Sequence, residues 1–227
     1  MQSDNLLDII QRRQTIYAFL KRLYEEELPK EFLAEMPGKM KPLLGIAETL
    51  PDAEAREAVK EFIQFTETIP SQDLADLEVR LAADYARLFL SINKVPPHPS
   101  ESIYLDGALM QYSRDEVLKT YWSFGANKKK EFAEPEDHIA VELSFLAYLC
   151  EKSIEALKNK DAKEARRCIQ GQKEFLEKHL MNWVPRLVKD ILDTGQTPFY
   201  KAMGILTKEY LEMDLSATRD LLEQLRG

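Results

Sequence analysis

The chain has 227 residues, of which 44% are hydrophobic and 31% are charged, and its formal net charge is −8. These values are typical of a globular protein with one large domain or two small ones, and they argue against a disordered chain. The negative charge argues against nucleic acid as a partner, because phosphates need basic surfaces, and it favours a basic partner.

Export and membrane signals are weak. No stretch approaches the roughly 18 apolar residues that a membrane-spanning helix needs, so we expect no stable membrane insertion. Residues 11–27, QRRQTIYAFLKRLYEEE, superficially resemble a twin-arginine export signal, but Lys21 and Arg22 interrupt the apolar run. Cys150 and Cys168 are too far apart for a redox motif and are expected to be buried thiols in a reducing compartment. We therefore expect a cytoplasmic protein.

Helical periodicity dominates the chain. Apolar residues recur every three or four positions from Leu6 to Leu23, which predicts a first helix, and two more are expected over about 52–69 and from Ser71 through Phe89. Later helices are expected at about 114–124, 135–159, 161–192 with a kink at Pro185, 198–212 and 215–225. No segment alternates apolar and polar residues as a strand would. The predicted fold is all-α, a single globular helical domain of eight or more helices.

A proline-rich connector interrupts this pattern. It contains three prolines within four positions, which cannot join a helix interior. We interpret residues 93–107 as a hinge between an N-terminal half, 1–92, and a C-terminal half, 108–227.

Catalytic signatures are scarce. The chain has no GxSxG elbow, no glycine-rich phosphate loop, and no cysteine close in sequence to a histidine. Glu134, His138 and Glu142 are spaced four residues apart and would share a helix face, but the Glu-x-x-His spacing of di-metal bundles is absent. We therefore expect neither an enzyme nor a cofactor. A carboxylate–histidine metal-dependent hydrolase or oxidase is the weaker alternative.

The stretch EPEDHIAVELSFLAYL, residues 134–149, has two interpretations. Pro135 suits the first turn of a helix, and acidic residues are favoured near the positive end of a helix dipole. That accounts for Glu136 and Asp137 but leaves His138 unexplained, because a protonated histidine is unfavourable there. Helix capping and a binding site both remain open on these grounds.

Three stretches in series carry a family resemblance. They are DYARLFL at 84–90 followed by VPPHPSESIYLDG, the 134–149 stretch, and FLEKHLMNWVPRL at 175–187. Together they resemble the TorD/DmsD/NarJ family of cytoplasmic chaperones for molybdenum-cofactor oxidoreductases, over about residues 80–190.

The resemblance implies an all-helical, non-catalytic protein that needs no cofactor. Such a chaperone binds the N-terminal, often twin-arginine, signal region of a molybdopterin-dependent oxidoreductase subunit until cofactor insertion and folding are complete. It also implies that Asp137 and His138 line a peptide-binding groove, and that the connector borders this groove with Pro97, Pro99, Ser102 and Tyr104. Some members of the family carry a tryptophan where Ser100 stands here, so the contacts that bind the apolar segment of the peptide are expected to differ.

Physical chemistry supplies the rest of the candidate site. Two guanidiniums need carboxylates, and the apolar segment needs a groove between helices. The candidate peptide-binding residues are Asp137, His138, Glu134, Glu136, Glu142, Pro97, Pro99, Glu101, Ser102, Tyr104, Tyr85 and Phe89, the last two being first of all expected core residues. A general helical protein–protein scaffold is the alternative function, and a domain-swapped homodimer stays open.

Overall fold

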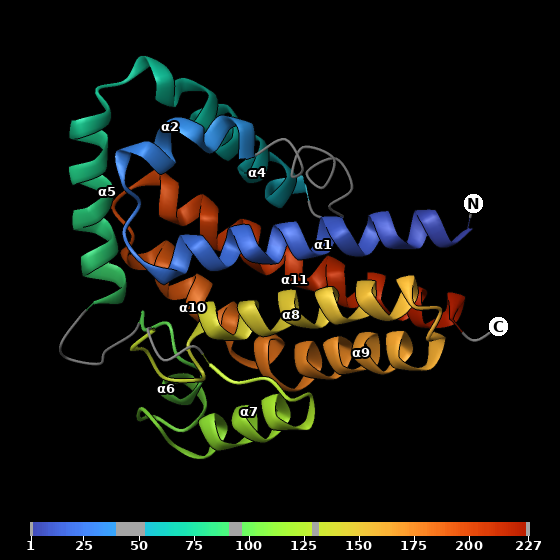
Figure 1. The fold of residues 1–227 in the computed structure, drawn as a ribbon. Helices are drawn as coiled ribbons and strands as arrows, with labels where there is room; N and C mark the ends of the chain where they lie inside the picture. The colour runs from blue at the N-terminus through green and yellow to red at the C-terminus, as the bar shows by residue number, and fades with distance from the viewer. Residues whose placement is uncertain (1, 40–52, 91–96, 129–131, 226–227) are drawn as a thin grey trace. The chain divides into compact units, whose positions relative to one another are not determined.

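The computed structural model describes residues 2–39, 53–90, 97–128 and 132–225, and every regular element in these ranges is helical (Figure 1). The helices are α1 (Gln2–Glu25), α2 (Lys30–Lys39), α4 (Ala53–Thr68), η1 (Ile69–Ser71), α5 (Leu74–Phe89), α6 (Glu101–Leu105), α7 (Tyr112–Ser123), α8 (Ile139–Lys158), α9 (Ala162–Phe175), η2 (Leu176–Leu180), α10 (Met181–Thr194) and α11 (Pro198–Gln224). The predicted all-α class with at least eight helices is confirmed. Predicted features within 40–52 and 91–96, including the start of the connector, lie outside the described residues.

Four predicted helix boundaries were wrong. The helix expected from Ser71 begins at Leu74, because Asp73 is its N-cap and its side chain accepts from the first free N–H groups. The helix expected over 161–192 is interrupted by η2, a turn of π-helix, while Pro185 lies inside α10. The pair expected at 198–212 and 215–225 is the single helix α11, because residues 213–217 contain neither proline nor glycine to end it. The helix expected from residue 135 begins at Ile139.

The chain divides into two compact units assembled from separated segments. The first comprises Met1–Arg22, Ser100–Trp183 and Leu211–Gly227, and the second comprises Leu23–Pro99 and Val184–Tyr210. The boundary after Pro99 falls within the predicted connector, whereas the others fall inside helices. The units therefore differ from two consecutive halves of the chain, and the hinge role of residues 93–107 stays a prediction.

A buried ion pair joins the two ends of the chain within the first unit. Arg13 on α1 donates from Nε to Asp214 Oδ1 at 2.6 Å and from Nη2 to Oδ2 at 2.8 Å, and the Tyr17 hydroxyl donates to the same carboxylate. Both charged side chains are buried, whereas Arg12 is exposed and pairs with Asp8. Arg13 is thus part of the core that links α1 to α11.

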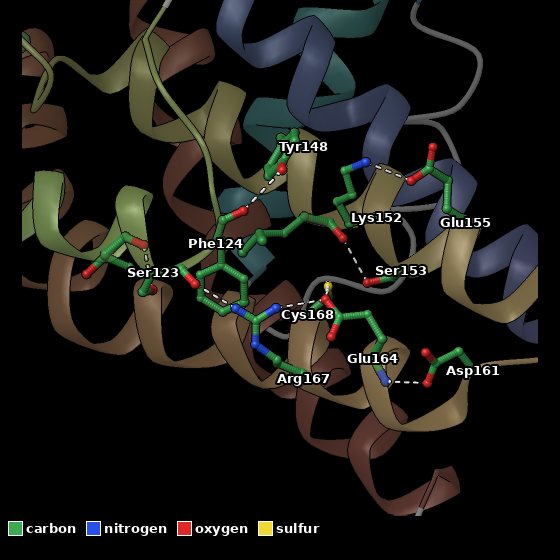
Figure 2. Close-up of polar contacts among 12 residues, drawn as sticks. Ser123, Phe124, Tyr148, Lys152, Ser153, Glu155, Asp161, Glu164, Arg167 and Cys168 are labelled. Atoms are coloured by element: carbon green, nitrogen blue, oxygen red, sulfur yellow. Dashed lines mark hydrogen bonds and ion pairs between the residues drawn. The ribbon is translucent and has the colours of Figure 1, made fainter. Parts of the chain in front are cut away.

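Helix α7 is anchored at its C-terminal end to the α8–α9 pair, as Figure 2 shows. Arg167 on α9 donates to the Ser123 carbonyl at 2.6 Å and lies over the Phe124 ring, 4.5 Å from its centroid. Tyr148 on α8 donates to the Phe124 carbonyl at 3.1 Å. A Cβ at Gly171 would lie 2.3 Å from Phe124 Cζ, so the ring approaches α9 where no side chain intervenes.

The second unit is organised around an aromatic cluster. The Tyr85 hydroxyl donates to the Tyr24 carbonyl at 3.1 Å, and the Phe89 ring makes edge contacts with Tyr24, Tyr85 and Tyr200. Asp84 accepts hydrogen bonds from Gln196 and Thr197 ahead of α11. The DYARLFL stretch therefore supplies core and capping residues to this unit.

Within the described residues, no helix has both the length and the apolarity required to cross a membrane.

Candidate functional site

Asp137 and His138 cap two different helices. His138 is the N-cap of α8: its backbone is extended and its Nδ1 accepts a hydrogen bond from the Ala140 N–H at 3.1 Å. In that contact Nδ1 carries no proton, so the ring is the neutral Nε2–H tautomer. Asp137 instead caps the start of α6. Its Oδ2 accepts a hydrogen bond from the Ser102 N–H at 2.8 Å, and its backbone carbonyl accepts one from the Glu101 N–H at 3.0 Å. Capping thus explains both residues locally.

A polar cluster is buried between these helix starts and the η2–α10 segment. Glu101 contacts His179 through an Oε2–Nδ1 distance of 3.0 Å, and both side chains are buried. The Trp183 indole donates to Glu142 Oε2 at 3.2 Å. His179 and Trp183 lie four residues apart across the start of α10, so η2 and α10 present both to the cluster.

Glu142 lies near two other buried carboxyl groups, those of Glu101 and Asp137. Burial raises the pKa of Glu142 well above its usual value, and the nearby carboxylates of Glu101 and Asp137 raise it further. Glu142 Oε1 meets no N–H or O–H donor among the other described groups. The raised pKa favours the neutral, protonated form of Glu142.

Three further oxygens of the cluster are buried without a partner in the described part of the chain: Asp137 Oδ1, Ser100 Oγ and Ser102 Oγ. Buried polar groups are usually hydrogen-bonded, and leaving one unpaired costs about 1–3 kcal/mol. The N-terminal end of α6 and the adjoining Asp137 thus carry buried polar atoms that no described protein group satisfies.

Glu136, next to this cluster, is ion-paired at the edge of the first unit. The Arg114 Nε donates to Glu136 Oε2 at 2.7 Å, and the Lys128 Nζ lies 3.8 Å from Oε1 and also donates to the Glu134 carbonyl. Burial opposes ionisation of Glu136 and is the largest single influence, but the hydrogen bond and charge of Arg114, a backbone hydrogen bond and the charge of Lys128 together outweigh it, so the pKa of Glu136 is lowered. Glu136 is therefore a carboxylate at neutral pH.

The arrangement gives no support to the predicted metal alternative. Glu134 and His138 precede α8, so the four-residue helical spacing with Glu142 does not exist, and His138 Nδ1 is engaged in capping. Among the described residues, no group of three histidine, cysteine, aspartate or glutamate side chains is placed to hold a metal ion.

The first unit brings together most of the predicted site residues. Glu101, Ser102, Asp137, His138 and Glu142 are buried there, Glu134 and Glu136 are half-buried, and the half-buried Tyr104 ring lies 5.6 Å from that of Trp183. Pro97, Pro99, Tyr85 and Phe89 belong to the second unit, where all four are buried. A role for any of these residues in peptide binding stays a prediction.

Sequence reasoning missed three participants: Arg114, His179 and Trp183. The stretch 175–187, which holds the last two, was part of the family resemblance, but neither residue was assigned to the site. Their four-residue spacing was the signal that they share a helix face. Arg114 gave no signal, because its partner Glu136 is 22 positions away.

Exposed apolar residues gather on the same unit. Leu105, Met110, Tyr112 and Trp122 are 40%, 60%, 69% and 61% exposed, and they lie on α6, α7 and the segment between them. Asp106 Oδ2 accepts from the Ser113 N–H at 2.9 Å and so holds that segment against the start of α7.

Comparison with known proteins is consistent across sequence and fold. The family model described as "Nitrate reductase delta subunit" matches residues 48–189. A chaperone protein TorD from Photobacterium profundum is 31% identical over 207 residues, covering 90% of this chain and 93% of the relative. Another TorD, from Vibrio cholerae, is 25% identical and covers 94% and 95%. A crystal structure of a protein described as a redox enzyme maturation protein, from Archaeoglobus fulgidus, has a similar fold, with a TM-score of 0.53, 20% identity, and coverage of 88% and 93%.

Proposed function

Because the chain belongs to the nitrate reductase delta subunit family, we propose that it is a cytoplasmic maturation chaperone that binds the N-terminal, twin-arginine signal region of a molybdenum-cofactor oxidoreductase. The TorD chaperones that resemble it over nine-tenths of its length support the chaperone role. The client is held until its molybdopterin cofactor is inserted and folding is complete. The chaperone itself supplies no chemical step.

The observation that carries this proposal is the Arg114–Glu136 ion pair. It is a guanidinium on a half-buried carboxylate next to a buried acidic cluster. Charge-assisted N–H···O bonds of this kind are the strong hydrogen bonds by which proteins recognise arginine. A twin-arginine segment offers two more guanidiniums, for which Glu136 and Glu134 are the accessible carboxylates.

The apolar part of the signal segment needs an apolar surface. Leu105, Met110 and Tyr112 provide one, on the α6–α7 segment that Arg114 joins to Glu136. Burial of apolar surface contributes about 25 cal/mol per Å², so a few large side chains are enough to favour docking.

Asp137 and His138 act in this proposal as positioning residues. Asp137 holds the start of α6, and His138 holds the start of α8 beside Glu136. Loss of either side chain is expected to displace the carboxylates and the apolar segment together.

Calorimetric titration tests the proposal. The ligand is a twin-arginine signal peptide from a molybdoenzyme of the same genome, with one control peptide carrying two lysines and another carrying charges in the apolar stretch. Saturable binding that both controls weaken is the expected result. Binding that is indifferent to the arginines would instead favour a general helical scaffold, and the absence of binding would overturn the proposal.

A further inference from the structure

An arginine of the chain itself occupies the carboxylate that a client arginine needs. Arg114 lies in the first turn of α7, and Glu136 lies in the turn that precedes α8. Their side chains are 27% and 17% exposed, so the pair is neither fully solvated nor sealed in the core. A ligand can therefore reach Glu136 after a side-chain rearrangement alone.

This contact differs from most ion pairs of the first unit. Lys119–Glu116, Lys152–Glu155 and Arg167–Glu164 are pairs within one helix, three residues apart. The Arg114–Glu136 pair instead joins two separate segments, and Lys128 adds a second positive charge 3.8 Å from the other oxygen of Glu136. Glu136 thus lies between two cationic side chains of its own chain.

We propose that Arg114, assisted by Lys128, is an internal competitor that occupies Glu136 until the arginines of a client replace it. The inference rests on the proposed function and adds the residue that tunes its affinity. Replacing one guanidinium with another conserves the N–H···O bond to Glu136, so the exchange leaves no buried carboxylate unpaired.

The carboxylate, rather than the competitor, discriminates against lysine. An ammonium group is a compact point charge and lacks the planar fork with which a guanidinium matches a carboxylate. A lysine of a client therefore contributes less at Glu136 than an arginine of a client does. Because either residue has to displace the same Arg114, the competitor lowers the affinity for both peptides by the same factor.

Titration of the Arg114→Gln variant with the twin-arginine peptide tests the inference. Exposed ion pairs are modest in strength, so we expect removal of the competitor to tighten binding about two- to fivefold. The lysine peptide should gain by about the same factor, because the same competitor is removed for both peptides.

The matched control is Arg219→Gln. Arg219 is 56% exposed and pairs with Glu177 at 3.0 Å, which likewise joins two elements of the first unit, and Glu177 also binds Lys173. This substitution removes the same charge and the same type of contact elsewhere, so it should leave peptide affinity unchanged. A similar gain in both variants would mean that net charge causes it and would overturn the inference.

Other outcomes separate the two proposals. If the wild-type protein binds the peptide and the Arg114→Gln variant binds it equally well or more weakly, the competitor role alone is overturned. No binding by the wild-type protein would overturn the proposed function and this inference together. If Arg114→Gln lowers the melting temperature, Arg114→Lys is used in its place. Lysine retains the positive charge but lacks the planar guanidinium, so this variant must still bind the arginine peptide more tightly than the wild-type protein does.

Discussion

Asp137 and His138 are adjacent in the sequence, yet their side chains accept hydrogen bonds from the first N–H groups of two different helices, α6 and α8. The junction between them thus fixes two helix starts at once. The buried carboxyl groups of Glu101 and Glu142 extend from those same two helices. Capping and the acidic cluster are therefore one structural arrangement.

Amide hydrogen exchange should separate the two caps. Loss of a capping side chain costs about 1 kcal/mol and frees the N–H groups that it bound. Asp137→Ala should speed exchange at Ser102, whose N–H the side chain binds, whereas His138→Ala should speed it at Ala140. Asp137→Asn retains one acceptor oxygen and serves as the control for Asp137→Ala. The same pattern of exchange in both alanine variants would contradict separate capping roles.

The protonated Glu142 should make stability depend on pH. Its pKa is raised in the folded protein, so its contribution is complete below the ordinary value of 4.5 and is lost as pH rises towards the folded value. Over that window the loss reaches up to about 1.4 kcal/mol for each pH unit.

Glu142→Gln keeps an acceptor for Trp183 and a donor for Glu101 but cannot ionise. We therefore expect its stability relative to the wild-type protein to rise between pH 5 and pH 9 in urea unfolding experiments. Glu151→Gln, at an exposed position of the same helix, should show no such trend. Parallel stability curves for Glu142→Gln and the wild-type protein would show that Glu142 is ionised at neutral pH.

Gly171 should be required for the anchoring of α7. The Cβ of Gly171→Ala would lie 2.3 Å from Phe124 Cζ, and overpacking of this kind typically costs about 1–3 kcal/mol. Gly38→Ala is the control, because nothing lies within 4 Å of a Cβ there. In a Phe124→Ala background, Gly171→Ala should cost less. Equal costs in both backgrounds, measured by chemical unfolding, would mean that the ring is not the obstacle.

Sequence periodicity was sufficient to predict the fold class but not the helix boundaries. The apolar face of α1 is visible in three- and four-residue spacing, because that spacing is a local property. Nothing local marks the π-turn of η2, whose residues Leu176, His179 and Leu180 are all buried by tertiary packing. The break predicted near residue 213 was wrong. An aspartate such as Asp214 can favour a turn by its local preference, but here its carboxylate is bound by Arg13 of α1 and α11 continues through it.

The candidate site was predictable only in part, for the same reason. Asp137 and His138 stand out because charged and apolar residues meet there, but their partners depend on the fold: Ser102 is 35 positions from Asp137. His179 and Glu101 are 78 positions apart, and no local pattern connects them. Sequence alone therefore finds candidate groups, whereas the burial of Glu101 and Glu142 near one another is seen only in the structure.

A double-mutant cycle between protein and peptide tests the central claim most directly. Dissociation constants are measured for the twin-arginine and twin-lysine peptides with the wild-type protein and with Glu136→Gln. We predict that lysine weakens binding to the wild-type protein about tenfold but has much less effect on the variant, a coupling on the order of 1 kcal/mol. The same factor in both proteins, or no binding to either peptide, would contradict recognition of client arginines at this carboxylate.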